Sequence, residues 1–274
     1  EGVLLEVRKP ARYLGNEWNA VKKDFSKQEV RFAVCFPDLY ELGMSNLGLR
    51  IIYGLLNEQE GVSCERVFLP DVDMQALLKK DNVPLFSLES KAPLAGFDFL
   101  GFSLSYELGY TNVLAVMDLA GMPLLAKDRD LSYPLVIAGG SCVSNPEPMA
   151  DFVDLFLIGE AEEALLEIIE KYKQIRTTNH EPRITNHEPR TTKEDILRSL
   201  AKIEGVYVPS FYETQYNSDG SFNGLIPKYP DLPLKINKRI VKDLNQAYYP
   251  AKWMVPYIPV VHDRAAVELM RGCP

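Results

Sequence analysis

The chain has 274 residues, a net charge of −8 and a sequence isoelectric point near 5.1. An acidic chain of this kind lacks a broad basic surface for nucleic acid, although a longer protein could carry one elsewhere. No apolar run approaches the roughly 18–20 residues that span a bilayer. The four cysteines stand far apart in the sequence, which suits a reducing cytosol and not a disulfide framework. We therefore expect a cytoplasmic protein without membrane association.

After a polar N-terminal extension over residues 1–28, short apolar runs alternate with segments of helical periodicity as far as residue 173. Apolar runs of this length are typical of strands that are covered on both faces. We expect Ser45 to cap the first helix, Asp71 to begin the second and Gly121 to end the third. A further helix is expected from about residue 160 to Lys173. The five expected strands are 31–36, 64–69, 97–104, 134–138 and 153–158.

This alternation predicts an α/β domain over residues 29–173, built on a doubly wound parallel sheet of five strands. The expected strand order is flavodoxin-like, with residues 31–36 central and residues 64–69 outside them. Ligands of such sheets bind beyond the carboxyl ends of the strands.

A polar tract follows this domain. The run Thr-Asn-His-Glu-Pro-Arg occurs at 178–183 and again at 185–190, and Ile184 is the only apolar residue of the tract. This tract, residues 176–192, offers little to bury. We therefore expect residues 174–195 to form a disordered surface insertion and not a metal site. Residues 196–264 are then expected to form a helix and an extended connector.

The turns after three of the strands carry small and hydroxyl-bearing residues. Small residues let a ligand approach the backbone closely, and hydroxyl groups supply hydrogen bonds. A tight strand-to-helix turn explains any one of these turns more simply, but three turns on the same rim of one sheet favour a ligand site. The candidate ligand-binding residues are Ser103, Leu104, Ser105, Gly139, Gly140, Ser141, Gly159 and Glu160.

Several of these residues lie in longer runs: Gly139-Gly-Ser141, Asn145-Pro-Glu-Pro148, Asp154 to Glu162, and the loop from Pro37 to Ser45 with Leu47-Gly48. Together these runs resemble the cobalamin-binding-type domain of radical S-adenosylmethionine (radical SAM) enzymes. More narrowly, four runs resemble one uncharacterised bacterial family of that superfamily. They are Lys9–Gly15, Phe102–Glu107, Thr111-Asn112 and His262–Cys273. The resemblance covers nearly the whole chain except residues 176–192.

In that family the last motif continues into Cys-x-x-x-Cys-x-x-Cys. Its three thiolates hold a [4Fe–4S] cluster, whose open iron binds S-adenosylmethionine and reduces it. Cys273 matches the first thiolate, and the alternative is an incidental cysteine. A lone cysteine cannot hold the cluster. Residues 265–274 would therefore begin a radical SAM barrel encoded downstream, which is the expected partner of this portion, and the portion alone would not be catalytically competent.

The resemblance also implies a corrinoid cofactor. The Asp-x-His-x-x-Gly motif, which supplies the lower axial histidine in better-known cobalamin domains, is absent. The three histidines, His180, His187 and His262, all lie outside the first strand-to-helix loop. Cobalamin would bind without a histidine below the cobalt, its nucleotide tail passing Ser103, Ser105, Gly139 and Gly140. Equally, the fold could have lost the cofactor.

Two functions remain open from the sequence. The resemblance implies methyl transfer or a related radical modification of a large substrate such as RNA. The alternative is a non-catalytic module of Rossmann-like fold that has lost the corrin and binds a nucleotide or a partner protein.

Overall fold

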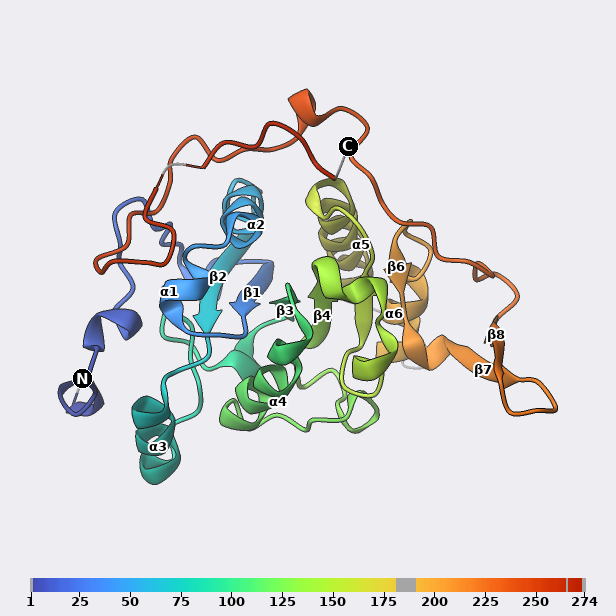
Figure 1. The fold of residues 1–274 in the computed structure, drawn as a ribbon, viewed down its shortest axis with the longest axis horizontal. Coiled ribbons are helices and arrows are strands. Elements are labelled where there is room, and N and C mark those ends of the chain that lie inside the picture. Colours follow the sequence, from blue (N-terminus) through green and yellow to red (C-terminus); the bar gives the residue numbers. More distant parts are fainter. Residues whose placement is uncertain (1, 181–190, 265, 273–274) are drawn as a thin grey trace.

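The computed structural model describes residues 2–180, 191–264 and 266–272. Its centre is a six-stranded sheet with the order β2-β1-β3-β4-β5-β6. Helices α2 and α5 lie on one side of the sheet, and α3 and α4 lie on the other (Figure 1). The strands of this sheet are β1 (Val30–Phe36), β2 (Val62–Phe68), β3 (Phe99–Ser103), β4 (Leu135–Gly139), β5 (Leu155–Leu157) and β6 (Val206–Tyr207). The helices are α1 (Tyr40–Gly43), α2 (Leu47–Asn57), α3 (Val72–Asp81), α4 (Tyr110–Leu119), α5 (Glu162–His180) and α6 (Lys193–Leu200).

The predicted doubly wound sheet is confirmed. Strands β1 to β5 pair in parallel, with β1 between β2 and β3, so the first strand is inside the sheet and the second is at its edge. All seven residues of β2 are buried, and Arg31 is the one residue of β1 that is not fully buried. This burial explains why the strands read as apolar runs instead of alternating patterns.

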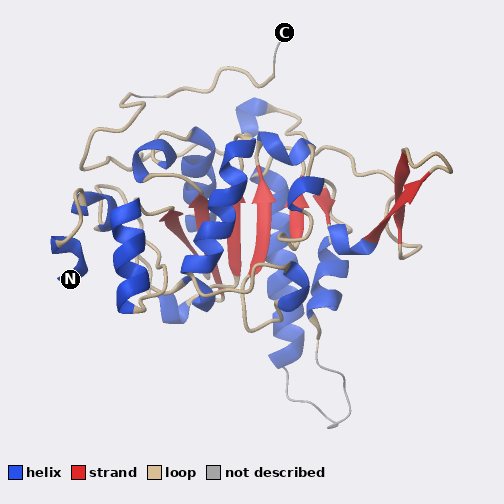
Figure 2. Ribbon diagram, turned by 60° about the horizontal axis from the view of Figure 1, so that its bottom comes forward, coloured by secondary structure: helices blue, strands red, loops and turns tan. Residues whose placement is uncertain are grey.

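Two β features lie outside the prediction. Strand β6 pairs antiparallel with β5 and adds a sixth strand to the sheet. Strands β7 (Tyr212–Tyr216) and β8 (Phe222–Pro227) form a separate hairpin that stands away from the central sheet (Figure 2). A strand of two residues, such as β6, is too short to give a periodic signal in the sequence.

The helix ends follow local capping chemistry. Asp71 caps α3 as predicted, and Gly121 adopts a φ of +67° just beyond α4. The predicted cap of α2 is wrong by one residue, because the Asn46 side chain accepts a hydrogen bond from the Leu49 N–H at 2.8 Å. Ser45 instead donates its hydroxyl hydrogen bond to the Glu41 carbonyl at 2.7 Å.

Helix α5 runs to His180 and therefore passes the predicted end at Lys173. A tertiary contact holds this extra length, because Arg176 binds Asp98 at 2.6 Å. Just before it, the Tyr172 ring packs on Phe99 with centroids 4.6 Å apart. The expected disordered insertion at 174–195 is thus helical as far as His180 and again from Lys193. Residues 181–190, the rest of that insertion, lie outside the described residues.

The N-terminal extension is fixed to the sheet edge by buried ion pairs. Arg66 of β2 is fully buried, and its guanidinium lies 2.5 Å from the Glu17 carboxylate and 2.6 Å from that of Glu89. The hydroxyl of Tyr40 also donates to Glu17, at 2.8 Å. A buried charge without a partner is costly, so these contacts tie the segment before β1 to the fold.

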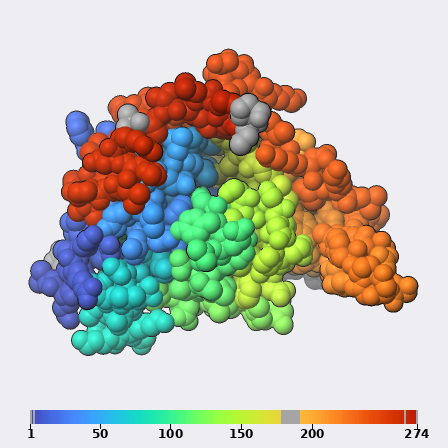
Figure 3. Space-filling model, viewed as in Figure 1, coloured from blue at the N-terminus to red at the C-terminus, as the bar shows by residue number. Residues whose placement is uncertain are grey.

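The connector after β8 returns across the carboxyl ends of the strands (Figure 2). Arg239 forms a parallel bridge with Gly159, and the His262 N–H donates to the Ser45 hydroxyl at 2.9 Å. The space-filling view shows this segment, in orange and red, lying along α2 and α5 (Figure 3). None of the helices in the described ranges has the length and apolar character of a membrane span.

Candidate functional site

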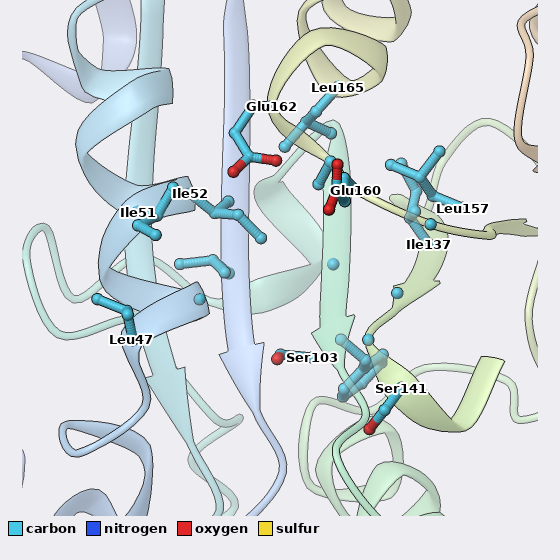
Figure 4. Close-up of a pocket in the computed structure, with 18 of the residues that line it drawn as sticks. Leu47, Ile51, Ile52, Ser103, Ile137, Ser141, Leu157, Glu160, Glu162 and Leu165 are labelled. Carbon is cyan, nitrogen blue, oxygen red and sulfur yellow. The ribbon is translucent and has the colours of Figure 1, made fainter. Parts of the chain in front are cut away.

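A cavity of about 570 Å³ lies against the sheet between α2 and α5. Leu47, Ile51 and Ile52 of α2 form one side, and Ile137 and Leu157 lie on the other (Figure 4). Small-molecule and cofactor sites are typically concave, mostly apolar and between about 300 and 1,000 Å³. The cavity therefore has the size and the lining of a ligand site.

The floor of the cavity is the face of strands β1 and β3. A Cβ atom on Gly101 would lie 2.5 Å from the tip of the Phe32 ring, so the ring rests directly on the glycine. Phe32 also stacks on Phe99, with centroids 5.7 Å apart. Phe32, Gly101 and Val34 line the cavity and give an apolar floor that suits an uncharged part of a ligand.

At the carboxyl ends of the strands the cavity opens to small and polar residues. Ser103 and Gly139 end β3 and β4 and are paired in register. A Cβ on Gly139 would meet only the Leu157 carbonyl oxygen, at 3.8 Å, so the glycine leaves open space there. Ser103 and Ser141 lie at this end of the cavity (Figure 4).

Gly140 has a different constraint from its neighbour. Its φ is +108°, and a Cβ there would lie 2.5 Å from the Leu104 carbonyl oxygen. Backbone approach of this kind requires glycine. Gly140 therefore shapes the turn, whereas Gly139 shapes the cavity.

The structure brings six of the eight predicted ligand-binding residues to the cavity wall: Ser103, Gly139, Gly140, Ser141, Gly159 and Glu160. Leu104 and Ser105 are not among its lining residues. Successive side chains of an extended chain point to opposite faces, so Leu104, which follows the lining residue Ser103, turns into the core. The Ser105 carbonyl accepts the Ser141 hydroxyl at 2.9 Å, while its side chain is exposed.

The far end of the cavity is charged. Glu160 and Glu162 lie at the start of α5, and the guanidinium of Arg271 donates to the Glu162 carboxylate from 109 residues further along the chain. Arg271 also lies 3.6 Å from Glu160 and 2.7 Å from Glu268. Hydrogen bonds to Glu268 and then Glu162 raise the pKa of Arg271 above its ordinary value. Arg271 could not be found from local patterns, because its partners are distant in sequence.

A second polar contact stands on the rim above the strand ends. The Tyr106 hydroxyl, from the loop after β3, donates to the Asp38 carboxylate in the loop after β1. Partial burial and this hydrogen bond raise the pKa of Tyr106 to about 12. The hydroxyl therefore stays protonated at neutral pH and joins the two loops.

The described cysteines do not form a metal centre. Burial raises the pKa of the Cys35 and Cys64 thiols well above their ordinary value, which disfavours the thiolates that bind metals. Within the described ranges, no three His, Cys, Asp or Glu residues are grouped to hold a metal ion. Cys273, the predicted cluster ligand, lies outside the described residues.

A family described as radical SAM proteins, N-terminal, matches residues 48–209. The chain belongs to this family. The matched region of this radical SAM protein runs from α2 past β6 and includes most of the cavity wall. The floor strand β1 and the segment around Arg271 lie outside it.

A curated relative of this radical SAM protein is the uncharacterized protein MJ0966 of Methanocaldococcus jannaschii. The two are 25% identical over 144 residues, which cover 51% of this chain and 26% of the relative. The chain thus matches about a quarter of the relative's length. The comparison with solved structures found no match.

Proposed function

We propose that this radical SAM protein binds a corrinoid through the cavity between α2 and α5 and presents it to a radical SAM barrel encoded downstream. The observation that carries the proposal is the open position at Gly139, where the cavity reaches the carboxyl ends of the strands. A planar corrin ring would rest over those ends, and its nucleotide tail would enter the cavity beside Gly139.

The lining fits the chemistry of such a tail. The heterocycle of the tail is flat and largely apolar, which suits the floor made by Phe32 and Gly101. The sugar and phosphate need hydrogen-bond partners once they are buried. Ser103, at the end of β3, would supply a hydroxyl donor, and Ser141, whose hydroxyl donates to the Ser105 carbonyl, would supply an acceptor.

The loop after β1 supports a corrinoid without a protein ligand below the cobalt. Asp38, Tyr40 and Gly43 have the spacing of the Asp-x-His-x-x-Gly motif, with Tyr40 at the position of the histidine. Tyr40 is only 2% exposed, and its hydroxyl donates to Glu17. It therefore faces the protein interior and not the cavity mouth.

Membership of the radical SAM family implies S-adenosylmethionine and an iron–sulfur cluster in the full-length proteins. We propose Cys273 as the first cluster thiolate. The proposed reaction of the whole protein is methyl transfer or a related radical modification of a large substrate such as RNA, in the cytoplasm.

The proposal is tested by titrating this chain with hydroxocobalamin, followed by absorbance and calorimetry. Saturable binding is expected, and Ser103→Val should weaken it because valine keeps the strand and removes the hydroxyl. The matched control is Ser132→Val, which changes a serine at the opposite end of the sheet. No binding to a folded chain, even with the downstream barrel supplied, would contradict the proposal. Saturable binding of a nucleotide in its place would favour the non-catalytic module.

A further inference from the structure

The segment from Ala266 to Gly272 crosses the charged end of the cavity and contributes Glu268 and Arg271 to its wall. Its apolar side chains do not anchor it, because Val267, Leu269 and Met270 are 74%, 86% and 59% exposed. The Tyr249 hydroxyl donates to the Ala266 carbonyl at one end of the segment, and Arg271 binds the start of α5 at the other. Arg271 is therefore the contact that joins this segment to the cavity.

The partners of Arg271 depend on it in turn. The Glu162 side chain is 9% exposed, and Glu160 stands two residues before it. Among the ion pairs of the described residues, Arg271 is the cation bound to both carboxylates. Without the guanidinium, two partly desolvated negative charges would face each other at the cavity wall, which is unfavourable.

We infer that Arg271 is a positioning residue that couples the ligand cavity to residues 266–272. By binding Glu160 and Glu162 it holds the segment in place as cavity wall, so a ligand in the cavity and the docked segment favour each other. Such coupling is reciprocal: a bound ligand stabilises the docked segment, and release of the segment weakens ligand binding by the same factor. The inference rests on the proposed function, because it requires that the cavity bind a ligand.

The coupling also links the two proposed cofactor sites of the whole protein. Arg271 precedes Cys273 by two positions in the sequence. A filled cavity would therefore favour an ordered segment ahead of the proposed cluster motif, and an assembled cluster site that orders the segment would favour a filled cavity.

Three variants of this chain test the inference. Arg271→Met removes the charge and keeps an unbranched apolar stem, while Arg271→Lys restores a cation at the same position. The matched control is Arg264→Met, which removes an exposed arginine of the same connector that is in no ion pair among the described residues. Each variant is measured by hydrogen exchange of residues 266–272 and by hydroxocobalamin affinity.

We expect Arg271→Met to speed exchange in the segment and to weaken hydroxocobalamin about tenfold, the effect of losing a charged hydrogen-bonded contact. Arg271→Lys should recover part of both, and Arg264→Met should change neither. Hydroxocobalamin should slow exchange of the segment in the parent chain and much less in Arg271→Met. Equal affinity of Arg271→Met and the parent would overturn the inference and leave the proposed function standing. Failure of the folded parent to bind hydroxocobalamin, even with the downstream barrel supplied, would overturn both.

Discussion

Gly139 and Gly140 are adjacent in the chain, yet only Gly139 has open space where a side chain would stand. We predict that Gly139→Val leaves the free energy of unfolding within about 1 kcal/mol of the parent, because the nearest atom to the new Cβ is 3.8 Å away. Gly140→Val should cost more than about 2 kcal/mol, because it combines a positive φ with a backbone clash. Urea denaturation measures both. Equal losses of unfolding free energy in the two variants would show that Gly139 has a structural role as well.

Asp154 is part of the run that resembles cobalamin-binding-type domains, but its contacts are structural. Its carboxylate accepts the Val136 N–H at 2.7 Å and binds Arg129 at 3.1 Å and Lys193 at 2.7 Å. Asp154→Asn should destabilise the fold by about 3 kcal/mol, because Arg129 is buried and would lose its counter-charge. Asp151→Asn, an exposed neighbour, is the control and should change stability by less than about 0.5 kcal/mol. If Asp154→Asn were as stable as the parent in thermal or urea unfolding, this role would be refuted.

Two deletions test separate parts of the polar tract. Replacing residues 181–190 by a short Gly-Ser linker should leave stability within about 1 kcal/mol, since Ile184 is the only apolar residue there. Deleting 176–192 should cost about 2 kcal/mol, because it removes the Arg176–Asp98 ion pair and the Thr192 cap of α6. Similar melting temperatures for the two deletions would show that these contacts contribute nothing.

The burial of Tyr40 predicts a spectroscopic result. Cob(II)alamin bound to this chain should show no nitrogen hyperfine splitting in its electron paramagnetic resonance spectrum, because Tyr40 faces the interior and the tail base is held in the cavity. A nitrogen splitting that is present in the parent and absent in His262→Ala would contradict this expectation. It would identify His262, whose N–H donates to the Ser45 hydroxyl, as a ligand of the cobalt.

Much of the fold was predictable because parallel strands covered on both faces leave apolar runs in the sequence. The strand order, the caps at Asp71 and Gly121, and the cluster of small residues at the ends of β3 and β4 all follow from local patterns. Leu104 and Ser105 do not line the cavity: Leu104 turns into the core because side chains of an extended chain alternate, and Ser105 lies in the exposed loop after β3.

The remaining features depend on contacts between distant residues. The extension of α5 beyond Lys173 is held by Asp98, and the charged end of the cavity is completed by Arg271. The burial of Tyr40 depends on Glu17 in the N-terminal extension. No periodicity within a short window reports such pairs, so the sequence predicted where the cavity opens but not which residues close it.

We propose that the cavity between α2 and α5 holds the nucleotide tail of a corrinoid. The most direct measurement compares hydroxocobalamin with cobinamide, which has the corrin ring but no nucleotide tail, in calorimetric titrations of the parent and of Gly139→Val. The parent should bind hydroxocobalamin at least about tenfold more tightly than cobinamide, the difference expected from burying one apolar ring. Gly139→Val should bind the two equally. Equal affinities of the parent for the two corrinoids, or a preference that survives in Gly139→Val, would contradict the account.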